Sequence, residues 1–166
     1  MNSVIRPTIY LMVGLPYSGK STFVQNHPML SALTVVDSDS YIEKRALKEN
    51  RSYGVIFGET IGLALAYRDE LVEKCFKRKS SFVIDQTNVT KESRARWIEW
   101  ANRHRYRIVV YSFALPPDED ALMERIKKRS NKVIPLSVLA DMIGQYEKPS
   151  LIEGFDSVVE IDTFGS

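Results

Sequence analysis

The stretch from Thr8 to Ser21, TIYLMVGLPYSGKS, joins a short apolar run to a glycine-rich turn that leads directly into a helical pattern. The part from Gly14 to Ser21 matches G-x-x-x-x-G-K-[ST] in full. Glycines in such a turn let successive backbone N–H groups converge on phosphate oxygens, and the start of the helix adds partial positive charge. The sequence therefore predicts a buried first strand, Thr8–Val13, followed by a phosphate-binding loop.

The residues of this loop form the predicted ATP-binding set. They are Gly14, Leu15, Pro16, Tyr17, Ser18, Gly19, Lys20, Ser21 and Thr22. As a catalytic residue, Lys20 is expected to reach the β- and γ-phosphates, and the Ser21 hydroxyl is expected to bind Mg²⁺. Tyr17 stands where a small residue would fit the turn more easily, so its ring either points outward or touches the substrate.

Short apolar runs alternate with longer helical patterns along the rest of the chain. Further strands are predicted at Leu33–Val36, Ser81–Ile84, Ile108–Phe113 and Ser157–Ile161. Helical periodicity covers Gly19–Asn26, Tyr41–Glu49, Val55–Lys79, Lys91–Arg103, Asp118–Arg129 and Pro135–Tyr146. This alternation predicts an α/β domain with a five-stranded, doubly wound parallel sheet, in which ligands bind at the carboxyl ends of the strands.

Residues at the ends of the helical segments predict where several helices begin and how one of them runs. Ser40 and Thr90 are suitable N-caps, and Pro135 suits a first helical turn. Because the last strand must begin at the far edge of the sheet to be parallel, the helix Pro135–Tyr146 is expected to make that descent. The segment 118–134 is then expected to stay across the carboxyl edge.

The segment 118–134, called the lid here, carries a cluster of positive charge. Within residues 124–132, five basic residues accompany one acid. Arg125 and Arg129 lie four residues apart and share one face of a helix. They are predicted to bind the phosphates of ATP, with Arg129 also catalytic, and the alternative is a solvated helix face.

Two strand ends carry acids at the predicted ligand edge. Asp37 and Asp39 follow the second strand, and a carboxylate there can orient an acceptor hydroxyl and take its proton. The spacing would aim both carboxylates to one side, so either is a candidate base, although Asp39 could instead only cap the next helix. Asp85 ends the third strand, where a carboxylate binds Mg²⁺ directly or through water, unless it serves an Asx turn.

The arginines of the next helical segment divide into two groups. Arg94 shares a helix face with Trp97 and lies one turn nearer the ligand edge, so it is predicted to meet a substrate phosphate. Arg103, Arg105 and Arg107 lie where this helix ends and the next strand begins, at the opposite edge of the sheet. Favourable charge at a helix C-terminus accounts for them, and they do not indicate a nucleic-acid surface.

Length and composition exclude several classes of protein. The 166 residues fit one globular domain, and a net charge of +2 excludes a histone-like polyelectrolyte. The chain has a single cysteine, Cys75, which excludes an internal disulfide. With one cysteine and only two histidines in the whole sequence, a zinc cluster is also disfavoured. No apolar run approaches the roughly 20 residues of a membrane span. We therefore expect a cytoplasmic protein that forms one kinase-type domain over residues 1–166 and does not enter the membrane.

In combination, these motifs resemble the polynucleotide 5′-hydroxyl kinase family of phages and animals. The resemblance extends from about Thr8 to Ile161. GLPYSGKST (residues 14–22) is similar to the family's phosphate loop, and ERIKKRSNKVIP (residues 124–135) is similar to the phage lid. IDQTNVTKESRARW (residues 84–97) and QYEKPSLIEGFDSVVEI (residues 145–161) resemble segments of the animal kinase domain.

The resemblance implies roles for several residues. It makes Asp39 the general base that takes the proton from a 5′-hydroxyl, and it makes Arg125 and Arg129 lid contacts to ATP. It also implies a place near the metal and the acceptor for Asp85 and its neighbours, so the predicted substrate-binding residues besides Arg94 are Asp39, Asp85, Thr87 and Asn88. The chain also departs from the family. Phage relatives carry an arginine shortly after the base that helps to hold the acceptor phosphate, whereas this chain has Ile42 near that point.

We therefore expect Mg²⁺-dependent transfer of the ATP γ-phosphate to the 5′-hydroxyl of DNA or RNA. The same loop and base would also serve a kinase that phosphorylates a small-molecule hydroxyl, such as a metabolite, sugar nucleotide or antibiotic, as zeta-toxin-like enzymes do. A nucleotide-binding regulatory module without turnover is the third hypothesis. The lid and Asp39 disfavour it, because a sensor has no need of an acceptor base.

Overall fold

The structure contains the five-stranded parallel sheet that the sequence predicts. The computed structural model describes residues 5–129 and 132–165, so Ser130 and Asn131 of the lid lie outside the described residues. The strands run in the order β2-β3-β1-β4-β5, and all neighbours pair in parallel. Their bounds are β1 Thr8–Val13, β2 Thr34–Val36, β3 Phe82–Ile84, β4 Arg107–Phe113 and β5 Ser157–Ile161. Each bound lies within one residue of its prediction, and the α/β fold class is confirmed.

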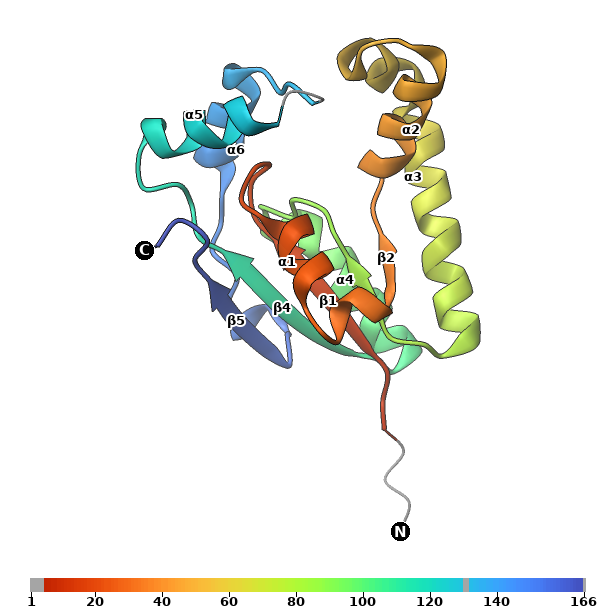
Figure 1. Cartoon of the computed structure of the whole chain (residues 1–166). Coiled ribbons are helices and arrows are strands. Elements are labelled where there is room, and N and C mark those ends of the chain that lie inside the picture. Colours follow the sequence, from red (N-terminus) through yellow and green to blue (C-terminus); the bar gives the residue numbers. More distant parts are fainter. Residues whose placement is uncertain (1–4, 130–131, 166) are drawn as a thin grey trace.

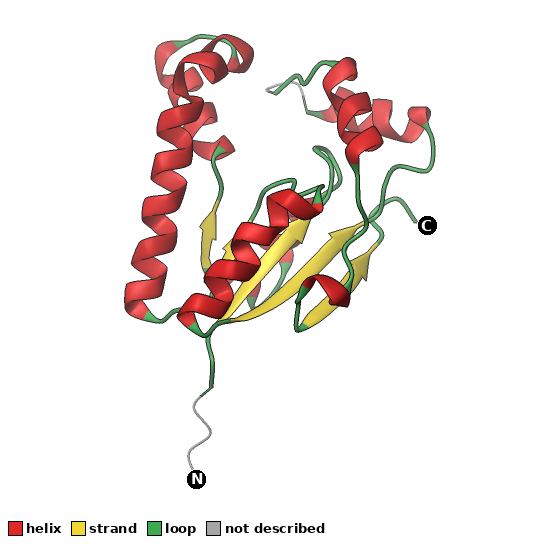
Figure 2. Cartoon of the chain, turned by 180° about the vertical axis from the view of Figure 1, so that it is seen from behind, coloured by secondary structure: helices red, strands yellow, loops and turns green. Residues whose placement is uncertain are grey.

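Helices lie on both faces of this sheet (Figures 1 and 2). They are α1 Lys20–Asn26, α2 Asp39–Glu49, α3 Tyr53–Arg78, α4 Lys91–His104, α5 Glu119–Lys128 and α6 Leu136–Gln145, with 3₁₀ turns η1 Leu30–Ala32 and η2 Leu151–Glu153. One core packs α3 and α4 against the sheet, and a second core packs α1 and η1 against its other face. Within the described residues, no helix is both long and apolar enough to span a membrane.

Strand β1 contributes to both cores, because successive side chains of a strand point to opposite faces. Ile9, Leu11 and Val13 lie in the core with α3 and α4. Met12 lies in the core with α1, where it packs near Val24. A strand that is covered on both faces is apolar along nearly its whole length. The apolar run before the phosphate loop therefore predicts strand β1 clearly.

The predicted helix starts need one correction. Thr90 caps α4 as predicted, with its side chain accepting a hydrogen bond from a backbone amide of the first turn. Ser40 is not an N-cap, because α2 begins at Asp39, after Ser38. Instead, the Asp37 carboxylate accepts a hydrogen bond from the Ser40 amide at 2.6 Å. A carboxylate forms a stronger, charge-assisted bond to an amide than a hydroxyl does, so Asp37 takes the capping role.

The predicted descent of the helix after Pro135 is wrong. Pro135 is the N-cap of α6, and α6 stays beside α5 at the carboxyl edge of the sheet (Figures 1 and 2). Leu139 of α6 and Leu122 of α5 are buried in one apolar cluster, and this burial holds α6 at that edge. The chain descends instead through the segment 146–156, which contains η2.

Arg94 does not reach the ligand edge, which corrects its predicted phosphate contact. Its side chain is fully buried, and its guanidinium binds both carboxylate oxygens of Glu153 at 2.9 and 3.1 Å. It also donates to the Asn88 carbonyl at 2.9 Å. The Asn88 side chain donates to the Met12 carbonyl and accepts from the Trp97 ring nitrogen. Arg94 and Asn88 therefore hold α4 and η2 on the sheet, and neither residue lines a cavity at the carboxyl edge.

The basic residues at the amino edge of the sheet lie where the sequence predicts. Arg105 is the C-cap of α4, and Arg107 opens β4 opposite Thr8. Arg103 pairs with Glu99, one turn earlier on the same helix. All of these arginines are remote from the phosphate loop, which follows the carboxyl end of β1.

Replacing Arg94 tests its structural role. We expect Arg94→Ala to lower the free energy of unfolding by about 3–5 kcal/mol, because it leaves the nearly buried Glu153 carboxylate without its partner. Urea denaturation followed by circular dichroism measures this loss. Arg103→Ala is the matched control, since its pair with Glu99 is exposed and should contribute less than about 1 kcal/mol. Equal losses in the two variants would contradict the role assigned to Arg94.

Candidate active site

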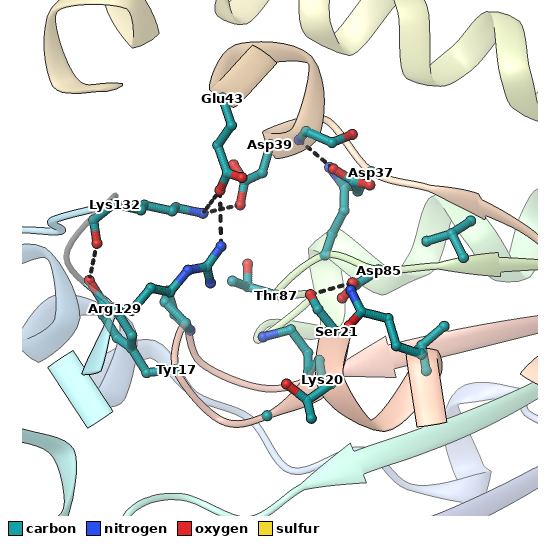
Figure 3. Close-up of a pocket in the computed structure, with 18 of the residues that line it drawn as sticks. Tyr17, Lys20, Ser21, Asp37, Asp39, Glu43, Asp85, Thr87, Arg129 and Lys132 are labelled. Atoms are coloured by element: carbon teal, nitrogen blue, oxygen red, sulfur yellow. Dashed lines mark hydrogen bonds and ion pairs between the residues drawn. The ribbon is translucent and has the colours of Figure 1, made fainter. Parts of the chain in front are cut away.

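A cavity of about 460 Å³ opens at the carboxyl edge of the sheet, between the phosphate loop, the ends of β2 and β3, α2 and the lid (Figure 3). The predicted site residues that line it are Pro16, Tyr17, Gly19, Lys20, Ser21, Thr22, Asp39, Asp85, Thr87, Arg125 and Arg129. Three other residues of the loop, Gly14, Leu15 and Ser18, are buried and do not line the cavity. Arg94 and Asn88 lie in the core.

Two glycines shape the phosphate loop. A Cβ atom on Gly14 would lie 2.8 Å from the Ser18 hydroxyl oxygen and 2.9 Å from Phe113 Cβ, so a larger residue does not fit. Gly19 has a φ of +92°, in the left-handed region that other residues rarely adopt. The first turn of α1 follows directly, and its backbone N–H groups have no acceptor within the helix. The loop and the helix start together suit a bound phosphate.

The Lys20 side chain is folded back onto the loop. Its Nζ donates to the Leu15 carbonyl at 2.6 Å and to the Gly14 carbonyl at 3.0 Å. Burial lowers the pKa of Lys20 to about 8, although the nearby Asp85 carboxylate opposes this effect. A phosphate in the loop would favour the charged ammonium, because it places negative charge beside it.

Ser21 and Asp85, the two predicted magnesium ligands, are in contact. The Ser21 hydroxyl donates to Asp85 Oδ2 at 2.7 Å, although the two residues are far apart in the chain (Figure 3). Hydroxyl and carboxylate oxygens are donors that Mg²⁺ prefers, so this pair fits the ion. Among the described residues, no group of three or more His, Cys, Asp or Glu side chains is placed to hold a metal. Mg²⁺ commonly takes only one or two protein ligands and completes its shell with phosphates and water.

Asp39 and Asp37 differ sharply in their surroundings. The Asp37 carboxylate caps α2, and burial raises its pKa. Asp39 accepts a hydrogen bond from the Tyr53 hydroxyl at 2.7 Å on Oδ1 and pairs with the Lys132 ammonium on Oδ2. Burial alone would raise the pKa of Asp39, but Lys132, Tyr53 and Arg129 outweigh it and lower the pKa. Asp39 is therefore held as a carboxylate, and the capping alternative belongs to Asp37.

Lys132 is a site residue that the sequence analysis did not single out. Its side chain is only 5% exposed, and its Nζ contacts the carboxylates of Asp39 and Glu43 (Figure 3). The ammonium also lies over the Tyr53 ring, 5.0 Å from its centroid. Lys132 was visible in the sequence only as one more positive charge of the lid, because its position depends on contacts with α2 and α3.

The two lid arginines hold different elements together. Arg129 pairs with Glu43 of α2 at 3.0 Å. Arg125 donates to the Thr163 carbonyl at 2.6 Å and to the Tyr17 carbonyl at 3.1 Å, and it stacks on the Phe164 ring. Both guanidinium groups line the cavity. Arg125 and Arg129 therefore lie on the side of the cavity that the lid forms, as the sequence predicts. Both guanidinium groups are hydrogen-bonded to other groups of the protein.

Tyr17 was expected either to point outward or to touch the substrate, and the structure shows a different role. It has a φ of +67°, which is unusual for a bulky residue, and its side chain is buried. The hydroxyl donates to the Lys132 carbonyl at 2.8 Å and accepts from the Ile134 amide at 3.2 Å. Tyr17 therefore ties the phosphate loop to the chain segment that presents Lys132 to Asp39.

Comparisons relate the chain to known proteins. The family model AAA_33, described as an AAA domain, matches residues 9–149. The bifunctional polynucleotide phosphatase/kinase of Schizosaccharomyces pombe is 26% identical over an alignment of 157 residues, and the match covers 92% of this chain. The chain spans about one third of the length of that curated relative, since the match covers 33% of it.

Solved structures share the fold at low sequence identity. A provisionally assigned kinase from Chloroflexus aurantiacus has a TM-score of 0.70 at 15% identity, with 96% of this chain and 86% of that chain covered. A gluconokinase from Sinorhizobium meliloti 1021 has a TM-score of 0.59 at 19% identity, with 97% of this chain and 85% of that chain covered. At these identities the likeness concerns the fold alone.

Removing the Tyr17 hydroxyl tests its link to the lid. Tyr17→Phe keeps the ring but leaves the Lys132 carbonyl and the Ile134 amide without their partner. We expect the free energy of unfolding to fall by about 1–3 kcal/mol and hydrogen exchange at the Ile134 amide to become faster. Tyr10→Phe is the control, because its hydroxyl donates to the Met29 sulfur in an exposed position. Unchanged exchange at Ile134 would contradict the link.

Proposed function

Since this chain belongs to the AAA domain family, we propose that it is an ATP-dependent phosphotransferase that phosphorylates a hydroxyl group. The observation that carries the proposal is the placement of Asp39, which faces the same cavity as Lys20 and the Ser21–Asp85 pair (Figure 3). Nucleotide binding alone needs no carboxylate at this position. Phosphoryl transfer to a hydroxyl does need one, because a base must orient the acceptor and take its proton.

The proposed reaction assigns a task to each side of the cavity. The phosphates of ATP bind to the loop, where Lys20, Arg125 and Arg129 balance their charge. Ser21 and Asp85 would hold Mg²⁺, which when bound neutralises charge on the β- and γ-phosphates. The acceptor oxygen forms its bond to the γ-phosphorus as the bond from that phosphorus to the β–γ bridging oxygen breaks, which releases ADP.

Asp39 receives the proton of the acceptor hydroxyl in this scheme. Lys132 keeps the carboxylate ionised and therefore able to accept a proton, and Tyr53 fixes its orientation through Oδ1. The phenol of Tyr53 remains a hydrogen-bond donor, because burial raises its pKa further above the neutral range. We also propose that residues 118–134 act as a lid over the phosphates, since the described part of this segment carries Arg125, Arg129 and Lys132 to the cavity.

We propose the 5′-hydroxyl end of DNA or RNA as the acceptor. The likeness to the polynucleotide phosphatase/kinase of Schizosaccharomyces pombe supports this choice, because it extends over 92% of this chain. A small-molecule hydroxyl is the second candidate. It is favoured by Ile42, which is fully buried in an apolar cluster of α2 and α3 and supplies no positive charge for an acceptor phosphate.

Asp39→Asn tests the proposed base. We expect phosphoryl transfer to fall about 10²–10⁴-fold, because the amide cannot accept the proton, while the dissociation constant for ATP stays within about threefold. Transfer from labelled ATP and calorimetric titration with ATP measure the two quantities. Asp141→Asn, an exposed change on α6, is the control and should leave both unchanged. Full transfer by Asp39→Asn would remove Asp39 as the base.

A panel of acceptors tests the proposed substrate. Labelled ATP is offered with 5′-hydroxyl DNA, 5′-hydroxyl RNA, nucleosides and sugars. We expect transfer to the nucleic-acid ends, whose hydroxyl has the chemistry that the base and loop require. Transfer to small molecules alone would overturn the nucleic-acid acceptor and leave the phosphotransferase in place. Binding of ATP with no transfer to any acceptor would favour a regulatory module.

The affinity for ATP is expected to fall as the pH rises through about 8. Lys20 is charged below its pKa of about 8 and neutral above it, so a higher pH removes the ammonium that binds phosphate. Calorimetric titrations on either side of this pH measure the effect. Lys20→Arg should flatten the dependence, because a guanidinium stays charged throughout this range. An unchanged dissociation constant for the native protein would contradict the assignment.

A further inference from the structure

A second cavity, of about 380 Å³, adjoins the first one and opens beside Asp39. The boundary between the two cavities is formed by residues that line both of them. They are Pro16, Asp39, Asp85, Gln86, Thr87 and Lys132. A molecule in the second cavity therefore meets Asp39 directly, and it lies beside the site proposed for the γ-phosphate.

The walls of the second cavity are built from two helix faces. Tyr53, Phe57 and Ile61 lie four residues apart along α3 and so share one face, and the rings of Tyr53 and Phe57 are neighbours, 5.9 Å between centroids. Val138 and Met142, also four residues apart, form the facing wall on α6. Phe57 remains 40% exposed and Val138 remains 38% exposed, so apolar surface faces the open space between the helices.

The charges around this cavity are unfavourable for an anion. Asp39 and Asp85 line it, and both are acids. Among the described residues that line it, Lys132 is the one cation, and its ammonium is buried and paired with Asp39. A carboxylate or phosphate placed between Phe57 and Val138 would lose its hydration without gaining a positively charged partner. The cavity instead suits an uncharged molecule with a flat, apolar face, which can pack on aromatic rings.

We propose that this cavity is the acceptor site and that it holds the acceptor by an uncharged ring, with a hydroxyl carried to Asp39. The terminal nucleoside of a 5′-hydroxyl end has this chemistry, because its base stacks on aromatic side chains and carries no charge. The phosphate that follows the terminal nucleoside stays outside the cavity. The inference rests on the phosphotransferase function proposed above and specifies what its acceptor site recognises.

Kinetics of three acceptors test this site. Adenosine, a short 5′-hydroxyl oligonucleotide and gluconate are compared as acceptors of phosphate from labelled ATP, each at low and high salt. We expect adenosine and the oligonucleotide to be phosphorylated with similar KM values that change little with salt, and gluconate to be refused. An oligonucleotide bound through its phosphates would show a steep salt dependence. That result, or transfer to gluconate but not to adenosine, overturns the proposal.

Phe57→Ala tests the ring-binding wall directly. We expect the KM for adenosine to rise about tenfold or more, as loss of a stacking ring commonly causes, with the KM for ATP unchanged. Leu63→Ala is the matched control, because Leu63 is an exposed apolar residue of the same helix that lies outside the cavity. An adenosine KM that is the same in Phe57→Ala and Leu63→Ala overturns the proposal.

Calorimetric binding separates this inference from the proposed function. Adenosine is titrated into the protein in the presence of a non-hydrolysable ATP analogue. Binding that Phe57→Ala weakens, together with no transfer to any acceptor, would overturn the phosphotransferase function and support a ring-binding cavity. Transfer to an acceptor with no binding of adenosine would overturn the ring-binding cavity and support the phosphotransferase.

Discussion

The parallel register of β1, β3 and β2 is the constraint on which the site depends. Leu11 lies opposite Ile84, and Ile84 lies opposite Val36, so the three strands end at the same edge. The phosphate loop, Asp85 and Asp37 follow these strand ends directly. Because side chains of all three strands pack in both cores, a shift in register would disrupt the packing on both faces of the sheet. The burial that stabilises the sheet therefore also aligns the residues of the site.

Features set by neighbours along the chain could be predicted from the sequence. The sheet is one, because each strand is an almost continuous apolar run. The phosphate loop is another, because its glycines stand where the backbone needs a positive φ, at Gly19, or close contact with neighbouring side chains, at Gly14. The proximity of Ser21 and Asp85 followed from the topology, since both lie just beyond parallel strand ends. The capping role belongs to Asp37 instead of Asp39 or Ser40, because helix α2 begins at Asp39, two residues earlier than an N-cap at Ser40 predicts.

Features set by distant contacts could not be predicted. Arg94 is held by Glu153, 59 residues away, and Lys132 reaches Asp39 across 93 residues. Tyr17 bonds to a carbonyl 115 residues away. Helical spacing indicates that Arg94 lies on a packed face of its helix. It does not reveal Glu153, the acid that pairs with the buried guanidinium there. In the same way, α6 stays beside α5 because their apolar faces pack against each other. The periodicity of either helix alone does not show which element its apolar face contacts.

The pairing of Lys132 with Asp39 has a consequence for the protein when it holds ATP but no acceptor. Water that enters the cavity beside the phosphates meets a carboxylate whose two oxygens are engaged by Tyr53 and Lys132. Each of these oxygens keeps a second lone pair, so Asp39 can still accept a hydrogen bond from an acceptor hydroxyl. For a phosphotransferase of the kind proposed, the contact with Lys132 would keep the base charged and in position while bound ATP waits for an acceptor.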